Sequence, residues 1–311
     1  MKLFLKTNFP KIFKQFQIIK HSLVITKIYS KKINSFFNDK NKIIKFYKKP
    51  QIDNLILSCT SFPARIKYFE YTLFSVINQN IRPKKIILWL SVDEFPNKEK
   101  DIPENLKRYE PYGLEIKFKN NNIRSYKKLI YSLSEFHSEI IITFDDDVFY
   151  NKNWLKLLYF NHLKNPNYII ANRVHKVSFT NYKIDSYNNW KKNNLKLSFL
   201  NFFTGIGGIL YPPDSLYKDV CNEKLFLDLS PNADDIWFYV MALLNKTKIL
   251  KINYFIKLYR NFDYIYNSDY LKIPKLSTNN VKNNENDIQL KKVLCHYNIY
   301  DNFYNLYGEN E

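Results

Sequence analysis

Three consecutive aspartates, Asp145-Asp146-Asp147, are the residues of this sequence with the clearest capacity for chemistry. Adjacent carboxylates repel one another, and near a protein core they are costly unless a cation neutralises them. Alternate side chains of an extended segment point the same way, so Asp145 and Asp147 can face one pocket. Oxygen ligands of this kind suit Mg²⁺ or Mn²⁺. The alternative is a solvated acidic turn, which the apolar flank from Ile140 to Phe144 disfavours.

Two further motifs follow the aspartates along the chain. The segment Gly205–Gly208 holds three of only 5 glycines and would let a backbone approach a ligand closely, although a tight turn also explains it. Asp234 and Asp235 precede the apolar run Ile236–Val240. One acid is enough to cap a helix or to complement its dipole. The second is then available to face a pocket as a general base.

Apolar runs and helical spacing indicate which elements hold these motifs. The first half predicts strands and helices in alternation, at Asn54–Thr60, Tyr68–Gln79, Lys85–Ser91, Leu114–Phe118, Ser125–Phe136 and Ile140–Phe144. This order predicts an α/β fold with a mainly parallel central sheet flanked by helices. Ligands then bind at the carboxyl ends of the strands, where the aspartates lie. The less regular second half predicts strands near Tyr168–Ala171 and Ile209–Tyr211, a helix over Asp234–Leu244 and an Asn-rich loop over Asn279–Asn286.

Charge is concentrated at the N-terminus. The 311 residues carry 48 Lys and Arg against 29 Asp and Glu, a net charge of +19. Residues 1–50 contribute +12, with 13 lysines and the single acid Asp39, and residues 51–311 contribute only +7. Apolar positions from Pro10 to Leu23 recur at helical spacing. The pattern predicts an amphipathic helix that either packs on protein or lies on an anionic membrane surface.

Composition excludes several classes of protein. A hydrophobic content of 45% excludes a disordered polymer. No apolar run approaches the ~18 residues that span a bilayer. The three cysteines, Cys59, Cys221 and Cys295, are far apart, which disfavours a disulfide scaffold or zinc cluster and fits a reducing cytoplasm.

Taken in order, the motifs resemble a GT-A fold glycosyltransferase of glycosyltransferase family 2, of the kind found in bacterial polysaccharide synthesis. Three segments are similar to the family's opening strand, helix and second strand: Cys59–Arg65, Ser75–Gln79 and Pro83–Leu88. Phe144–Phe149 resembles the DxD motif, and is also similar to Fringe-type β-1,3-glycosyltransferases, in which a glycine-rich strand and an Asp-Asp pair follow. The resemblance covers about residues 52–250 and implies a Rossmann-like GT-A fold with a basic helical N-terminal extension.

The expected organisation has three parts. Residues 1–50 form a basic amphipathic helical leader, 51–255 the GT-A domain, and 256–311 a C-terminal extension that packs on the catalytic domain. Within that domain, a nucleotide-sugar half spans about 52–150 and an acceptor half about 151–255.

The resemblance also implies residue roles around the metal and the reacting sugar. Asp147 would be the principal metal ligand, with Asp145 and Asp146 near the ribose and the metal-bound diphosphate, and Asp145 a second ligand. Asp234 or Asp235 would deprotonate the acceptor hydroxyl, with Asp235 slightly preferred. A C-terminal histidine often joins the metal in such folds. His296 is the candidate here, against the alternative of a buried structural histidine.

Other residues would border the nucleotide. Thr60, Pro63 and Arg65 lie on the loop after the first strand, and Asp93 after the second is a looser candidate. Lys128 would meet the base or a phosphate, unless it is a surface lysine. Many family members carry paired acids after the second strand, whereas this chain reads Leu90-Ser-Val-Asp93, so the uridine contact is left open.

The implied function is a metal-dependent glycosyltransferase that uses Mn²⁺ or Mg²⁺. It would move a hexosyl or N-acetylhexosaminyl group, with inversion, from a nucleotide-diphosphate sugar, expected to be a UDP-sugar, to a glycan hydroxyl. The pathway would be cell-surface polysaccharide or lipooligosaccharide synthesis. The enzyme would work at the inner face of the cell membrane, with residues 1–50 on anionic lipid close to a lipid-linked acceptor.

Two other classes of function compete. A metal-dependent nuclease or phosphotransferase also uses clustered aspartates, but it usually draws them from several strands, and no P-loop GxxxxGK[ST] is present. A nucleic-acid binder predicts an Arg-rich face interleaved with aromatics. Only 6 of the basic residues are arginines and the charge is terminal, so no nucleic-acid partner is expected.

Overall fold

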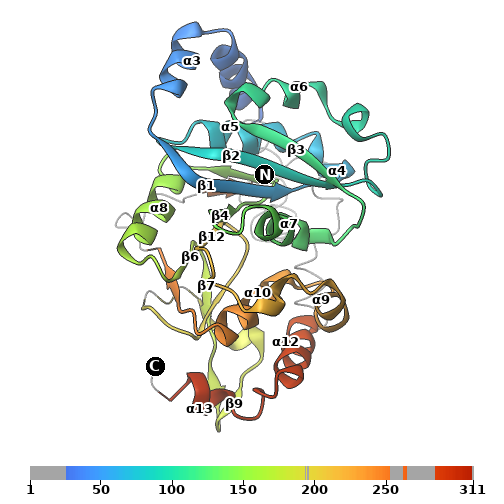
Figure 1. The fold of residues 1–311 in the computed structure, drawn as a ribbon. Coiled ribbons are helices and arrows are strands. Elements are labelled where there is room, and N and C mark those ends of the chain that lie inside the picture. Colours follow the sequence, from blue (N-terminus) through green and yellow to red (C-terminus); the bar gives the residue numbers. More distant parts are fainter. Residues whose placement is uncertain (1–25, 193, 195, 253–261, 265–283, 310–311) are drawn as a thin grey trace, which may run out of the picture.

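The computed structural model describes residues 26–252 except 193 and 195, together with residues 262–264 and 284–309 (Figure 1). The helix expected between Pro10 and Leu23 lies outside the described residues, as does most of the loop expected over Asn279–Asn286.

A seven-stranded sheet forms the centre of the molecule, in the order β13-β6-β12-β4-β1-β2-β3. Each strand is parallel to its neighbours except β12, which runs antiparallel to both β4 and β6. The prediction of a mainly parallel central sheet is therefore confirmed. The bounds of its strands, in chain order, are β1 Gln51–Thr60, β2 Arg82–Ser91, β3 Leu114–Lys119, β4 Ile140–Thr143, β6 Ile169–Ala171, β12 Ile209–Tyr211 and β13 Ile249–Lys251.

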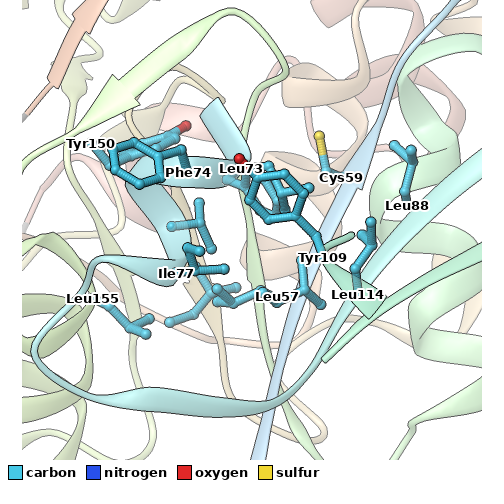
Figure 2. Packing of buried hydrophobic residues seen from close by; sticks show 14 of the residues in the cluster. Leu57, Cys59, Leu73, Phe74, Ile77, Leu88, Tyr109, Leu114, Tyr150 and Leu155 are labelled. Carbon is cyan, nitrogen blue, oxygen red and sulfur yellow. The ribbon is translucent and has the colours of Figure 1, made fainter. Parts of the chain in front are cut away.

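Both faces of the sheet are covered because its central strands are apolar on both sides. Leu57 and Cys59 of β1 face a core that includes Leu73 of helix α5 (Phe69–Ile77), as Figure 2 shows. Trp89 of β2 points to the other face. Its indole nitrogen donates a hydrogen bond of 2.8 Å to the hydroxyl of Ser132 on helix α7 (Lys127–Glu135). In Figure 1, α5 and α7 accordingly lie on opposite sides of the sheet.

The second half adds smaller sheets and helices around the strand ends. A three-stranded antiparallel sheet has the order β10-β7-β11, and β8-β9 and β5-β14 are two-stranded antiparallel pairs. The strand bounds are β5 Val148–Tyr150, β7 Val174–Lys176, β8 Phe179–Thr180, β9 Lys183–Ile184, β10 Lys191–Lys192, β11 Asn201–Phe203 and β14 Phe262–Tyr264. The remaining α-helices are α3 Lys40–Tyr47, α4 Pro63–Ile66, α6 Glu104–Lys107, α8 Trp154–Lys164, α9 Glu223–Leu229, α10 Asp234–Leu244, α12 Glu285–His296 and α13 Phe303–Tyr307.

Short 3₁₀ turns complete the described structure. They are η1 Lys98–Asp101, η2 Glu110–Tyr112, η3 Arg124–Tyr126, η4 Tyr187–Asn189 and η5 Lys218–Cys221. Helix α10 has the bounds that the sequence predicts, whereas α12 and α13 are additional. Val293 and Leu294 of α12 are fully buried in the same core cluster as Trp237 of α10. The described part of the C-terminal segment therefore packs against α10.

Part of the basic N-terminal segment also belongs to this body. Residues 26–37 are helical and α3 follows them. Ile33, Phe36 and Phe46 are buried in the core cluster that contains Leu57, and Phe36 lies against the rings of Phe74 and Tyr112. The expected division at residue 50 thus runs through one continuous core.

Candidate active site

One cavity of about 200 Å³ collects the chemical motifs from separate parts of the chain. Its walls include Asp145 after β4, Gly205 after β11, Asp234 and Asp235 at the start of α10, and Lys128 of α7. Parallel strands β1 and β4 end at the same edge of the sheet, and the aspartates follow there. The sequence motifs are therefore brought together, at the edge where the fold predicts ligand binding.

Lys128 is the cation at the centre of this arrangement. Its Nζ lies 3.5 Å from Asp145 Oδ1 and 3.5 Å from Asp234 Oδ2, and the residue is only 8% exposed. Burial alone would lower the pKa of Lys128, but the facing carboxylates of Asp234, Asp145 and Asp235 raise it well above the usual value. The alternative of a surface lysine is therefore wrong.

The backbone of α7 is fixed by buried hydroxyl groups. Ser58 of β1 donates a hydrogen bond to the Lys128 carbonyl, and Ser132 donates one of 2.7 Å to Ser58 Oγ. These two contacts tie α7 to the central strand β1 at Lys128 and at Ser132. The side chain of Lys128 consequently starts from a fixed position.

Asp235 is held by the glycine-rich segment. Both its carboxylate oxygens accept the Gly205 amide proton, each at 3.0 Å. A Cβ at position 205 would lie 2.9 Å from Lys128 Nζ and 3.2 Å from Asp235 Oδ1, so only glycine fits without displacement. Burial and repulsion from Asp234 raise the pKa of Asp235 to about 7. A carboxyl group with that pKa can exchange a proton near neutral pH.

The remaining aspartates are held by the loop after β1. Asp146 is buried, accepts a hydrogen bond of 2.6 Å from Ser61 Oγ, and forms an ion pair of 3.0 Å with Arg65 Nη1. The same Arg65 nitrogen lies 3.2 Å from Asp147 Oδ2. Burial raises the pKa of Asp145 to about 6, against the opposing attraction of Lys128. Arg65 thus pairs with Asp146 and Asp147, whereas Lys128 pairs with Asp145.

The other residues expected at the nucleotide have more varied positions. Thr60 ends β1, and its hydroxyl donates a hydrogen bond of 2.8 Å to the Trp89 carbonyl of β2. Pro63 is the first residue of α4, the short helix that carries Arg65. Asp93 is exposed on the loop after β2.

An ion pair of a buried lysine, which sequence reasoning missed, lies beside Asp93. Lys127 is 2% exposed, and its Nζ donates hydrogen bonds to Glu94 and to Asn122 Oδ1, the latter at 3.1 Å. The available signal was the second acid, Glu94, directly after Asp93. The pair fixes the loop after β2 to the start of α7.

The donor set suits a hard divalent cation in part. Asp145 Oδ2 is buried and has no hydrogen-bond partner among the residues that the structure describes, so this oxygen is available to a metal ion. Its chemistry fits Mg²⁺ or Mn²⁺. In the described parts of the chain, however, no three His, Cys, Asp or Glu side chains are placed to hold one ion.

His296 is not part of this constellation. It is exposed in the last turn of α12, and its ring lies against that of Tyr297. The structure does not bring it to Asp145 and Asp147, so the expected three-residue metal set is not assembled. The alternative of a buried structural histidine is also wrong, because His296 is exposed. The sequence did not show that α12 packs its apolar face on α10 and exposes the opposite one.

Several cavity residues carry no motif in the sequence. They contribute a guanidinium, a phenol, two hydroxyls and an amide, and are Arg173, Tyr187, Ser125, Thr204 and Asn232. One feature of the sequence could have identified Arg173 as a site residue. It closely follows the apolar strand β6, in the same way that the aspartates follow β4.

Comparison with known proteins places these observations in a family. The sequence matches the profile of glycosyl transferase family 2 over residues 59–220, more than half of the chain. No curated protein matches the sequence significantly.

Solved structures similar to this chain include Staphylococcus aureus TarS 1-349, with 14% identity over 67% of this chain and a TM-score of 0.42. The same protein in complex with UDP-GlcNAc has 13% identity, covers 67% of this chain and 57% of that chain, and has a TM-score of 0.39. An apo UDP-glucose pyrophosphorylase has 7% identity, covers 80% of this chain and 98% of that chain, and has a TM-score of 0.42. The chain spans 59% of the length of TarS 1-349.

Proposed function

Because the chain belongs to glycosyl transferase family 2, we propose that it moves a sugar from a nucleotide-diphosphate sugar to a glycan hydroxyl. UDP-sugar is the expected donor, and the group transferred is a hexosyl or N-acetylhexosaminyl group. The proposal includes dependence on Mg²⁺ or Mn²⁺ and inversion at the anomeric carbon.

The observation that carries this proposal is the convergence of two acidic motifs on one lysine. Lys128 Nζ is equally distant, at 3.5 Å, from Asp145 of the first motif and from Asp234 of the second. Asp145, which would face the donor, and Asp234 and Asp235, which would face the acceptor, therefore share one cavity. That proximity is what an in-line displacement between two bound substrates requires.

The chain's residues would divide the reaction as follows. Asp235 accepts the proton of the acceptor hydroxyl while the hydroxyl oxygen attacks the anomeric carbon. The bond from that carbon to the diphosphate oxygen breaks at the same time. Lys128 holds Asp145, and Arg65 holds Asp146, by ion pairs. A Mg²⁺ or Mn²⁺ ion held by Asp147 and Asp145 would stabilise the negative charge on the leaving nucleoside diphosphate.

A panel of nucleotide sugars tests the proposal. We expect release of the nucleoside diphosphate from one donor in the presence of Mn²⁺, and loss of that release with a chelator. Asp147→Asn should abolish metal-dependent transfer, while Asp53→Asn, at an exposed position of β1, should not. Near-normal turnover by Asp147→Asn would overturn the assignment. Cleavage of a phosphodiester or transfer of a phosphoryl group instead would favour the nuclease or phosphotransferase alternative.

The proposed setting is the inner face of a bacterial cell membrane, where the enzyme builds a cell-surface polysaccharide or lipooligosaccharide on a lipid-linked acceptor. Among the described residues, no helix is both long enough and apolar enough to cross a bilayer. Attachment would be peripheral, through the lysine-rich residues 1–50 and anionic lipid.

Deletion of residues 1–25 tests this attachment. The deletion must stop there because Ile33, Phe36 and Phe46 are core residues. We expect the shortened protein to lose sedimentation with vesicles that contain anionic lipid, while it keeps donor hydrolysis. Unchanged sedimentation would contradict attachment by this segment.

A further inference from the structure

Arg173 is a cation of the cavity that the reaction described above does not use. It lies between β6 and β7, is half-buried, and lines the cavity together with Lys128 and Asp235. Among the described side chains, none of the carboxylates comes within the 4.0 Å of an ion pair with its guanidinium. Lys128 and Arg65, by contrast, each face two carboxylates.

The hydrogen-bond partner of Arg173 is a neutral group. Arg173 Nη2 lies 3.1 Å from Nε2 of His175, which is 3% exposed. Burial, with the charges of Arg173 and Lys192, lowers the pKa of His175 to about 4. The imidazole is therefore uncharged at neutral pH and orients the guanidinium without neutralising it.

The neighbouring strands extend this positive charge towards solvent. In the antiparallel register of β7 and β10, Lys192 lies opposite His175 and Lys191 opposite Lys176. Lys191 and Lys192 are exposed. Like charges placed directly opposite destabilise a pair of strands, and an anionic ligand would offset that repulsion.

The position of Arg173 separates it from the donor side of the cavity. Arg65 and the three aspartates belong to the ends of β1 and β4, whereas Arg173 follows β6, on the far side of β12. Tyr187, whose ring centroid is 5.2 Å from that of His175, lines the cavity on the Arg173 side. A ring beside a guanidinium that has no carboxylate partner among the described side chains suits a sugar that carries an acidic group.

We propose that Arg173 binds a carboxylate or phosphate group of the acceptor, so that the acceptor is an acidic glycan. This inference rests on the proposed transfer to a glycan and names the class of acceptor. Arg173 acts as a specificity-determining residue, because its planar guanidinium can form two parallel hydrogen bonds to either anion.

Three probes that share one sugar ring test the inference and distinguish the two anions. They are methyl β-D-glucoside, methyl β-D-glucuronide and methyl β-D-glucoside 6-phosphate. Binding of each to the full-length chain, with UDP and Mn²⁺ present, is measured by calorimetry. We expect at least one acidic probe to bind about ten- to a hundred-fold more tightly than the neutral one, as for a hydrogen bond to a charged group. The stronger of the two identifies the anion.

Matched variants assign that preference to Arg173. Arg173→Gln should remove it, Arg173→Lys should retain part of it, and Lys164→Gln, which removes an exposed charge from α8, should leave it unchanged. A wild type that does not favour either acidic probe overturns the inference, and so does an Arg173→Gln variant that keeps the preference. UDP binding is measured separately. A protein that prefers the acidic probes but does not bind UDP would count against the proposed function and not against this inference.

Discussion

Lys128 determines the electrostatics of the site at the scale of single residues. Its ammonium group lies among carboxylates that belong to separate motifs, and it is almost completely buried. Removing one partner of a buried ion pair leaves the other charge uncompensated, which is costly. Lys128 therefore contributes both to the stability of the fold and to the proton affinity of the acids around it.

Replacement of Lys128 by glutamine should have two measurable effects, one on stability and one on the pH dependence of transfer. The free energy of unfolding should fall by about 3 kcal/mol, because buried carboxylates lose their counter-charge. Urea denaturation measures this, with Lys164→Gln as an exposed control that should change little. A Lys128→Gln protein as stable as the control would show that the carboxylates do not depend on this cation.

The pH dependence of transfer should report Asp235. With its pKa raised to about 7, the base is protonated below that pH and inactive, so the rate should rise with pH and level off above about 7. Because Lys128 lowers the pKa of Asp235, Lys128→Gln should move this rise to higher pH. A transfer rate that stays roughly constant between pH 5 and pH 8 would exclude Asp235 as the base.

Asp235→Asn should reduce the turnover rate about 10²- to 10⁴-fold, the usual contribution of a general base. Donor affinity should change much less, because Asp235 faces the acceptor side in the proposed reaction. Steady-state kinetics with saturating acceptor and varied donor measure both quantities. Loss of donor binding with an unchanged turnover rate would assign Asp235 to the donor site instead.

At the scale of elements, the close packing of β11, α7 and α10 around Gly205 limits what the site tolerates. Gly205→Ala should lower the turnover rate, because the added methyl group would displace Lys128 or Asp235. Gly113→Ala is the matched control. Position 113 has a φ of 95°, and an added Cβ there would lie 4.0 Å from the Lys84 carbonyl oxygen, an ordinary contact. This variant should lose about 1–2 kcal/mol of stability through its backbone conformation and keep its turnover rate. Equal turnover rates in the two variants would contradict the packing argument.

Sequence patterns predict the elements well and their convergence poorly. The helix at Asp234–Leu244 is predicted with its observed bounds because acids precede a long apolar run. The burial of Lys128 depends in part on a segment far away along the chain, as the Lys128–Asp234 pair shows, and no local pattern encodes such a contact. Helix α12 was missed for another reason, since the Asn-rich segment before it concealed the helical spacing of Leu290, Val293 and Leu294.

At the scale of the whole molecule, the basic N-terminal segment joins surface charge to the main core. Phe36 is 5% exposed and contacts aromatic rings from α5 and η2. Phe36→Ala should therefore cost about 3–5 kcal/mol of unfolding free energy, as for other buried phenylalanines. The half-exposed Ile44 of α3 provides a control, because Ile44→Ala should cost far less. Thermal or chemical unfolding measures both, and equal losses would show that residues 26–47 are not an integral part of the core.

Strand β12 has a mechanical consequence for how substrates reach the cavity. It is hydrogen-bonded on one side to β4, which precedes the aspartates, and on the other to β6, which precedes Arg173. The part of the sheet that precedes the aspartates and the part that precedes Arg173 are therefore continuous through backbone pairs. A hinge that opened between them would have to break these pairs. Any motion that admits the sugar or releases the products would therefore take place in the loops at the strand ends, while the sheet beneath them stays closed.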